Sequence, residues 1–387
     1  MPLQLKLAAE LEENPAAYRL KQNKSVVVRL GHEDRVWQVS WDPSGLRLAS
    51  CSGDKSVRVW APLMQSRFFT DEHQNEMGRT WECVDTIDAA HKRTVRSVAF
   101  EPTRGRTLAT ASFDGTTGIW EKEEDGGVFE CIATLEGHEN ETKSVSWSPS
   151  GHLLATCGRD RSVWIWESSG EGDFDCVSVL MEHTNDVKMV TWHPKDDLLA
   201  SFSYDDSIRL WREDDDDWYS AATLTGHTST VWAGAFSPDD GRFLASVSDD
   251  RTVRIWAAPA AAAAQSDAVR DGFYHKPDTT YECIAVVPDS VHTRAIYSVA
   301  WTRPLSDGGS EQLGFLATGC GDNTMRILRV TAADDGSLSG GINVALECSY
   351  QHAHALSDIN CVQWNPVYPT WLATAGDDGV VRIWHLE

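Results

Sequence analysis

The sequence predicts an all-β protein, a propeller whose seven blades each contain a four-stranded sheet. Two observations lead to this fold. The same unit, with a histidine, a small hydroxyl residue, an aspartate and a tryptophan at fixed places, recurs seven times over residues 25–387. Each copy also has short apolar segments separated by turn residues, which is typical of strands. A single blade cannot bury both faces of its sheet, so the blades stack on one another until the ring closes.

Each unit begins with a histidine followed by an apolar strand that ends in an aromatic residue. The histidines are His32, His91, His138, His183, His227, His292 and His354, with His352 as an alternative in the last unit. The aromatic residues are Trp41, Phe100, Trp147, Trp192, Phe236, Trp301 and Trp364, and a proline usually follows two residues later. This pattern predicts the first strand of each blade.

The second strand always carries Leu-Ala-Ser or Leu-Ala-Thr, and an aspartate follows in a turn. The hydroxyl residues are Ser50, Thr110, Thr156, Ser201, Ser246, Thr318 and Thr374. The turn aspartates are Asp54, Asp114, Asp160, Asp205, Asp250, Asp322 and Asp378. A third strand ends in Trp60, Trp120, Trp166, Trp211, Trp256, Leu328 and Trp384. A more variable fourth strand follows, for example residues 130–135.

The chain ends at the third strand of the seventh unit, so one strand of that blade is missing. Residues 25–30 form an isolated apolar strand near the N-terminus, and we expect them to supply the missing strand and close the ring. Residues 1–24 are predicted to be a partly disordered extension, although Leu3, Leu5, Leu7 and Leu11 fit one side of a short helix before Pro15. Two inserts, 61–80 and 257–279, are predicted to be mobile loops.

The composition excludes several classes of function. A formal net charge of −24 argues against general binding to nucleic acid or to an anionic membrane. No secretory leader and no apolar run of membrane-spanning length is present. The nine cysteines form no regular framework and no CxxC pair, so we expect a reducing compartment, no metal and no cofactor. The cysteines that recur at strand positions are predicted to be small core residues.

The repeated positions resemble the WD40 β-propeller family. The resemblance implies a hydrogen-bonded tetrad in each blade, in which the aspartate binds the histidine, the histidine binds the hydroxyl and the hydroxyl binds the tryptophan indole. Seven copies of such a set indicate structure rather than catalysis, so we expect no enzyme. In the first and third blades the tetrads are His32, Ser50, Asp54 and Trp60, and His138, Thr156, Asp160 and Trp166. Leu328 should truncate the network of blade six.

The same fold places the turns with the histidine and the aspartate on one face of the ring. Side chains that flank the start of each first strand, or precede each turn aspartate, should surround the mouth of the channel there. They include Arg35, Trp37, Arg96, Phe113, Lys143, Arg159, Lys188, Tyr204, Trp232 and Tyr297. Cations and aromatic rings in a concave site favour an acidic segment with an apolar or aromatic side chain, and Arg159 could bind its carboxylate. The alternative is that these are solvated surface side chains.

Blades three and four contain sequence segments that are unusual for a WD40 protein: Gly137-His138-Glu139-Asn140-Glu141, Trp192-His193-Pro194, Ser203-Tyr204-Asp205-Asp206 and the acidic segment 214–218. Together these resemble the WD40-repeat family of the cytosolic iron–sulfur protein assembly machinery. The resemblance implies a non-enzymatic scaffold of a targeting complex that helps deliver iron–sulfur clusters to cytosolic and nuclear apoproteins. It implies a cytoplasmic location and leaves the nucleus open as a second one.

The partners implied by this resemblance are a DUF59-type assembly protein, a HEAT-repeat adaptor, a hydrogenase-like cluster carrier and client proteins with C-terminal aromatic peptides. It also makes Arg159 the residue most expected to matter. Relatives can carry a Leu-Tyr-Arg tripeptide, a proposed recognition element for a co-chaperone, where this chain has Leu210-Trp211-Arg212. Because Trp211 also fills the tetrad position, we do not expect this tripeptide to recruit a chaperone. Two other functions remain open: a different WD40 adaptor, such as a ubiquitin-ligase substrate receptor or a chromatin-peptide reader, and, least favoured, an enzyme with a His/Asp pair in the channel.

Overall fold

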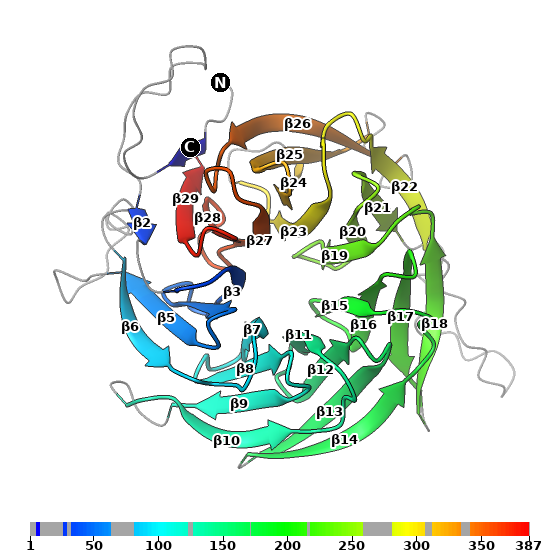
Figure 1. Ribbon diagram of the computed structural model, residues 1–387. Coiled ribbons are helices and arrows are strands. Elements are labelled where there is room, and N and C mark those ends of the chain that lie inside the picture. Colours follow the sequence, from blue (N-terminus) through cyan, green and yellow to red (C-terminus); the bar gives the residue numbers. More distant parts are fainter. Residues whose placement is uncertain are drawn as a thin grey trace, which may run out of the picture.

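The protein is a ring of seven antiparallel sheets around a central channel, as the sequence predicted (Figure 1). The computed structural model describes residues 5–7, 26–28, 32–62, 81–122, 127–170, 172–214, 217–257, 281–305, 312–333 and 341–386. These residues form strands and turns. They contain no helix that is long and apolar enough to cross a lipid bilayer. Most of the inserts 61–80 and 257–279, for which mobile loops were predicted, lies outside the described residues.

Each blade runs outward from the channel in the order of the chain. Blades 1 to 3 comprise β3 (Val36–Trp41), β4 (Leu48–Ser52), β5 (Val57–Pro62) and β6 (Trp81–Ile87); β7 (Val95–Phe100), β8 (Thr107–Ser112), β9 (Thr117–Glu121) and β10 (Glu130–Leu135); and β11 (Thr142–Trp147), β12 (Leu153–Gly158), β13 (Val163–Gly170) and β14 (Asp173–Leu180). Blades 4 and 5 comprise β15 (Val187–Trp192), β16 (Leu198–Ser203), β17 (Ser207–Glu213) and β18 (Trp218–Thr225); and β19 (Val231–Phe236), β20 (Phe243–Ser248), β21 (Val253–Ala257) and β22 (Glu282–Val287). Blade 6 comprises β23 (Ile296–Thr302), β24 (Gln312–Cys320), β25 (Thr324–Ala332) and β26 (Ile342–Gln351).

Blade 7 joins the two ends of the chain. Its strands β27 (Ile359–Trp364), β28 (Trp371–Gly376) and β29 (Val381–Leu386) are completed by β2 (Val26–Val28), which pairs with the first half of β29. The predicted closure is therefore confirmed.

A second N-terminal strand, β1 (Leu5–Leu7), pairs with the other half of β29, Leu5 lying opposite Leu386. The helical interpretation was therefore wrong for Leu5 and Leu7, which lie in a strand, whereas Leu3 and Leu11 lie outside the described residues. Residues 384–386 extend beyond β2, and pairing with β1 satisfies backbone groups that an open sheet edge would leave exposed. The other residues of 1–24 lie outside the described part of the chain.

The core lies between neighbouring blades, where the faces of adjacent sheets pack together. Between blades 1 and 2, for example, Val57 and Val59 pack with Val98, Phe100 and Leu108, and all five are at most 6% exposed. Complete burial of such a side chain contributes roughly 1.5–3 kcal/mol. Closure of the ring therefore gives every sheet an apolar neighbour on both faces.

Buried tetrads hold the turns of each blade in place. In blade 3, His138 Nδ1 lies 2.7 Å from Asp160 Oδ2, His138 Nε2 lies 2.9 Å from Thr156 Oγ1, and the Trp166 indole donates to the same hydroxyl at 3.0 Å. Burial tends to raise the pKa of Asp160, but the bonds from His138 and Ser162 outweigh it and lower that pKa to about 2. Blade 1 repeats the arrangement with His32, Asp54, Ser50 and Trp60 at 2.8–2.9 Å.

Blade 6 departs from this network. His292 Nε2 lies 2.9 Å from Thr318 Oγ1, as in the other blades. The Asp322 carboxylate, however, accepts a hydrogen bond from Arg326 at 2.8 Å, and His292 Nδ1 has no partner among the described residues. Burial and the nearby Arg326 lower the pKa of His292 to about 3, so the ring stays neutral.

Blade 7 uses His354 in its tetrad. His354 binds Asp378 and Thr374, each at 2.8 Å. The alternative, His352, bonds instead to the carbonyl of Ala355 in its own turn.

The prediction that the strand cysteines are core residues was correct for the inner strands and wrong for the rim. Cys51, Cys157, Cys320 and Cys361 are buried. On the fourth strands, Cys131, Cys176 and Cys283 are exposed and Cys348 is half-buried; Cys83, which was not part of this prediction, is exposed as well. The fourth strand is the outermost of each blade, so its side chains point to solvent as well as to the core. Each exposed thiol bonds to the carbonyl two residues later, across a β-bulge.

Candidate functional site

Seven side chains at one repeated position line the upper end of the channel, on the face that carries the histidine and aspartate turns. The preceding residue of each inner strand is buried in the blade, and side chains of a strand alternate, so this next side chain points into the channel. The seven, which we call the inner ring, are Trp37, Arg96, Lys143, Lys188, Trp232, Tyr297 and Asn360. The three cations come from consecutive blades 2 to 4, and the aromatic rings come from blades 5, 6 and 1. The inner ring thus has a cationic half and an aromatic half.

The cationic half has more positive than negative charge. Lys143 Nζ lies 2.5 Å from Asp186 Oδ2, and Lys188 Nζ lies 3.4 Å from the same oxygen. Arg96 forms no ion pair with any described residue. Burial and the nearby Lys143 ammonium lower the pKa of Lys188 to about 8, and only Asp186 opposes them strongly. Two of the three cations therefore share one carboxylate, and a second anion would relieve the repulsion among the three.

The aromatic half is in contact with these cations. The Arg96 guanidinium lies 4.8 Å from the centre of the Trp37 ring, and the Lys188 ammonium lies 5.0 Å from that of Trp232. Trp232 and Tyr297 meet edge to face at 5.3 Å. The Trp232 indole donates to Asp249, whereas the buried Trp37 Nε1 has no partner among the described residues. The Trp37 N–H is thus a buried donor without an acceptor among the described residues.

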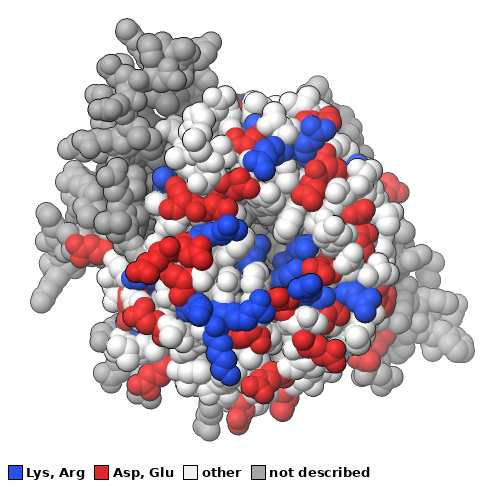
Figure 2. Space-filling view, in the orientation of Figure 1, with Lys and Arg blue, Asp and Glu red and all other residues white. Residues whose placement is uncertain are grey.

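A depression of about 370 Å³ adjoins the inner ring over blades 2 to 4. It is lined by Phe113, Glu141, Lys143, Arg159, Asn185, Asp186 and Tyr204. The Arg159 side chain is 57% exposed, and its Nη1 lies 3.2 Å from Glu141 Oε2. Lys143 belongs to both the depression and the inner ring, and Asp186 of the depression pairs with Lys143 and Lys188 of the inner ring, so the depression and the ring form one continuous surface. Figure 2 shows the Lys and Arg side chains gathered around the hollow of this face.

The structure brings nine of the ten predicted residues into these two linings. The exception, Arg35, lies at the rim, 3.8 Å from Asp377 and 5.8 Å from the Trp37 ring. Sequence reasoning missed Arg93, whose guanidinium donates to the Phe113 carbonyl at 2.6 Å and to Glu141 at 3.2 Å. Its position in the loop after His91 was the available signal, since that loop opens on the same face.

Metal-ligating side chains do not gather in the described residues. No group of three or more His, Cys, Asp or Glu side chains among them could hold a metal ion. Each histidine of the repeat is occupied with its hydroxyl partner, as in the tetrads above. What the face offers is charge, aromatic surface and hydrogen-bond donors, which are the properties of a binding site.

Comparisons with known proteins agree with this architecture. The family model for the WD domain, G-beta repeat, matches residues 23–61, 81–121, 129–167, 174–212, 218–257 and 346–385. The unmatched stretch 258–345 contains β23, β24 and β25 of blade 6, where Leu328 replaces the repeat tryptophan.

Several relatives cover nearly the whole propeller. A protein of Vanderwaltozyma polyspora named probable cytosolic iron-sulfur protein assembly protein 1 is 41% identical over 375 residues, which is 91% of this chain and 96% of that protein. The probable cytosolic iron-sulfur protein assembly protein Ciao1 of Culex quinquefasciatus is 44% identical, over 92% of this chain and 96% of its own. A probable cytosolic Fe-S cluster assembly factor of Schizosaccharomyces japonicus is 43% identical, and the match spans 52% of its length. The chain is therefore a WD40-repeat protein and belongs to the family of the cytosolic iron–sulfur protein assembly proteins.

Proposed function

We propose that the protein acts in cytosolic iron–sulfur protein assembly as a non-enzymatic scaffold, in the cytoplasm and also the nucleus. It helps deliver clusters to cytosolic and nuclear apoproteins by holding assembly partners and client peptides together. The names of the relatives support the process, and the lining of the channel mouth supports a binding role. The partners that fit this proposal are the DUF59-type assembly protein, the HEAT-repeat adaptor, the hydrogenase-like cluster carrier and clients with C-terminal aromatic peptides.

One observation supports the peptide site: three cations, two of which share a single carboxylate, face three aromatic rings across the channel mouth. A peptide that ends in an aromatic residue carries the complementary groups. Its terminal carboxylate would supply a second anion beside Arg96 and Lys188. Its ring would pack against Trp232 and Tyr297.

Arg159 has a different place in this proposal. Its guanidinium lies outside the inner ring, lines the depression and is bound to Glu141 through one nitrogen, Nη1. We assign it, with Phe113 and Tyr204, to the acidic residues that precede the peptide's last residue. Arg159→Glu should therefore weaken binding by repulsion without removing the terminal contact.

The test is binding of a fluorescent peptide with two acidic residues and a free C-terminal tryptophan, measured by anisotropy. We expect Arg96→Gln and Lys188→Met each to weaken binding at least tenfold, which corresponds to about 1.4 kcal/mol. Arg303→Gln is a matched control, because it also removes one cation from the protein. Arg303 follows the inner strand β23 at the opposite end of the channel, is 60% exposed and pairs with Asp239. Undiminished binding by correctly folded inner-ring variants would remove the site assignment. Affinity purification that recovers ubiquitin-ligase or histone-complex subunits instead of assembly factors would favour the other adaptor functions.

A further inference from the structure

Lys188 is an enclosed amine in the cationic half of the inner ring. Its side chain is 9% exposed, and its ammonium lies 4.9 Å from the centre of the Tyr204 ring and 5.0 Å from that of Trp232. It pairs with Asp186 Oδ2 at 3.4 Å, and Lys143 binds the same oxygen at 2.5 Å. Because Lys143 has the closer bond and the more exposed side chain, at 16%, Lys188 is the amine of the pair that loses its proton more easily. With its pKa at about 8, half of the Lys188 side chains are neutral near pH 8.

Four other carboxylates at the channel mouth already have partners. These pairs are Glu141 with Arg93 and Arg159, Asp249 with the Trp232 indole, Asp358 with Arg294, and Asp377 with Asn360 and Arg35. The cationic half is therefore left with three positive charges, from Arg96, Lys143 and Lys188, and with the one negative charge of Asp186. A reaction that turned one of these cations into an anion would balance the charges.

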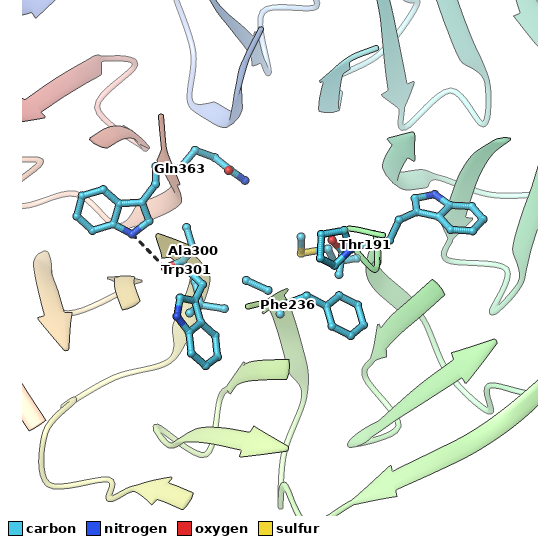
Figure 3. A pocket seen from close by; sticks show the side chains of 12 residues that line it. Thr191, Phe236, Ala300, Trp301 and Gln363 are labelled. Carbon is cyan, nitrogen blue, oxygen red and sulfur yellow. Dashed lines mark hydrogen bonds between the residues drawn. The ribbon is translucent and has the colours of Figure 1, made fainter. Parts of the chain in front are cut away.

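The channel below Lys188 offers no anion among the described residues. Met189, the next residue of β15, lines a pocket of about 190 Å³, and the described residues around that pocket are all uncharged. Figure 3 shows Thr191, Phe236, Ala300, Trp301 and Gln363 around it. An uncharged apolar molecule suits this stretch of the channel better than an anion, which would lose its hydration without gaining a charged partner.

The space beside the three cations is small. The cavity that the inner ring bounds measures about 30 Å³, which has room for roughly two water molecules. Carbon dioxide is uncharged, has three heavy atoms and reacts with neutral amines. We propose that Lys188 reacts with carbon dioxide to form a carbamate, whose negative charge pairs with Lys143 and Arg96. Three cations and one carboxylate then become two cations and two anions.

The reaction balances without a further reactant. The lone pair of the neutral Lys188 Nζ forms an N–C bond with the carbon of carbon dioxide. One C=O π bond gives its electron pair to oxygen, and one N–H bond breaks and releases its proton to water. No group is oxidised or reduced. The modification needs no peptide, so it is independent of the proposed function.

The test is trapping of the carbamate in the full-length protein. The protein is equilibrated with ¹³C-labelled bicarbonate and carbon dioxide at pH 8, treated with triethyloxonium ion, which converts a carbamate into a stable ethyl ester, and digested for mass spectrometry. We expect a labelled adduct on the peptide that contains Lys188. Peptide mapping separates it from a carbamate on a terminal α-amino group. Lys195 is the internal control and should carry no adduct, because it is exposed in a turn and water solvates its ammonium.

The carbamate would lie where the terminal carboxylate of a client peptide is proposed to bind. Bicarbonate should therefore weaken binding of the acidic peptide to the wild-type protein more than chloride does at equal ionic strength. A trapped adduct on Lys188 without weaker peptide binding would contradict the peptide site and leave the carbamate in place.

A variant tests the role of the neighbouring cation. Lys143→Gln removes the ammonium that pairs with the carbamate and lowers the pKa of Lys188, so the Lys188 adduct should fall by at least about threefold. Arg303→Gln removes a cation at the opposite end of the channel and should leave the adduct unchanged. The wild-type result decides the matter even if Lys143→Gln does not fold. No labelled adduct on Lys188 in the wild-type protein, equal labelling of Lys195, or full labelling of Lys188 in Lys143→Gln would overturn the proposal.

Discussion

Replacing Asp160 with asparagine removes one charge from the tetrad of blade 3 and leaves the side chain almost the same size. The carboxylate accepts bonds from His138 Nδ1 at 2.7 Å, from Ser162 Oγ at 2.6 Å and from the backbone of Glu139 at 3.1 Å. An amide offers one acceptor oxygen in place of two, and its NH₂ group would face groups that now donate. The variant therefore weakens the network without creating a cavity.

The magnitude follows from the pKa. The native network lowers the pKa of Asp160 from 3.8 to about 2, and one unit corresponds to roughly 1.4 kcal/mol. The ionised form thus contributes about 2 kcal/mol to the free energy of unfolding. Because the folded-state pKa is depressed, this contribution is complete above the unfolded-state value near 4 and is lost as the pH falls toward 2.

Urea unfolding followed by tryptophan fluorescence measures the effect. At pH 7, we expect Asp160→Asn to reduce the free energy of unfolding by about 2 kcal/mol, and the difference from wild type should shrink below pH 4. Arg159→Gln is the control, because the neighbouring side chain is 57% exposed and has no bond to the tetrad. It should change stability by less than about 0.5 kcal/mol. A loss for Asp160→Asn no larger than that of the control, or one that is independent of pH down to 3, would refute the reasoning.

Three further outcomes are expected. The affinity for the acidic peptide should fall as the pH rises from 7 to 9, because the Lys188 ammonium loses its proton at a pKa of about 8; anisotropy titrations should show this dependence reduced in Lys188→Met. Gly234→Ala would place a Cβ 2.2 Å from Phe202 Cζ, so thermal unfolding should show a loss of roughly 1–3 kcal/mol from overpacking. Deletion of residues 1–28 removes both partners of β29, and light scattering should detect association of the exposed edge, whereas deletion of residues 1–3 should leave the protein monomeric.

The fold was predictable because each blade repeats the same residues, which satisfy the same buried polar groups in every copy. A buried histidine such as His138 needs two partners, and the sequence supplies the hydroxyl and the aspartate at constant places. The pairing of β1 with β29 could not be predicted in this way. It depends on how far β29 extends beyond β2, and three leucines at alternate positions fit a strand as well as they fit a helix.

The sequence predicted which side chains reach the mouth of the channel, but it did not predict which of the cations form ion pairs there. The repeat position identifies Arg96, Lys143 and Lys188 equally. Only the structure shows that both lysines bind the single carboxylate of Asp186 while Arg96 binds none. The bond of Trp301 was likewise hidden, because this residue matches the repeat in sequence but its indole donates to Leu313 of its own blade.

These departures separate two kinds of position in the propeller. Where a side chain satisfies a buried group of its own blade, as Asp160 does, its identity follows from the blade and carries no information about ligands. At other positions the side chain has no buried group of its own blade to satisfy, so its identity can be set by a ligand. The inner ring consists of such positions, and it contains three cations although the chain as a whole carries a charge of −24. Arg159 is adjacent to Asp160 in the chain but belongs to the second kind, since its one ion-pair partner, Glu141, is itself shared with Arg93. A ligand that takes Arg159 away from Glu141 would leave that carboxylate still paired, which makes exchange at Arg159 less costly than at a singly paired arginine.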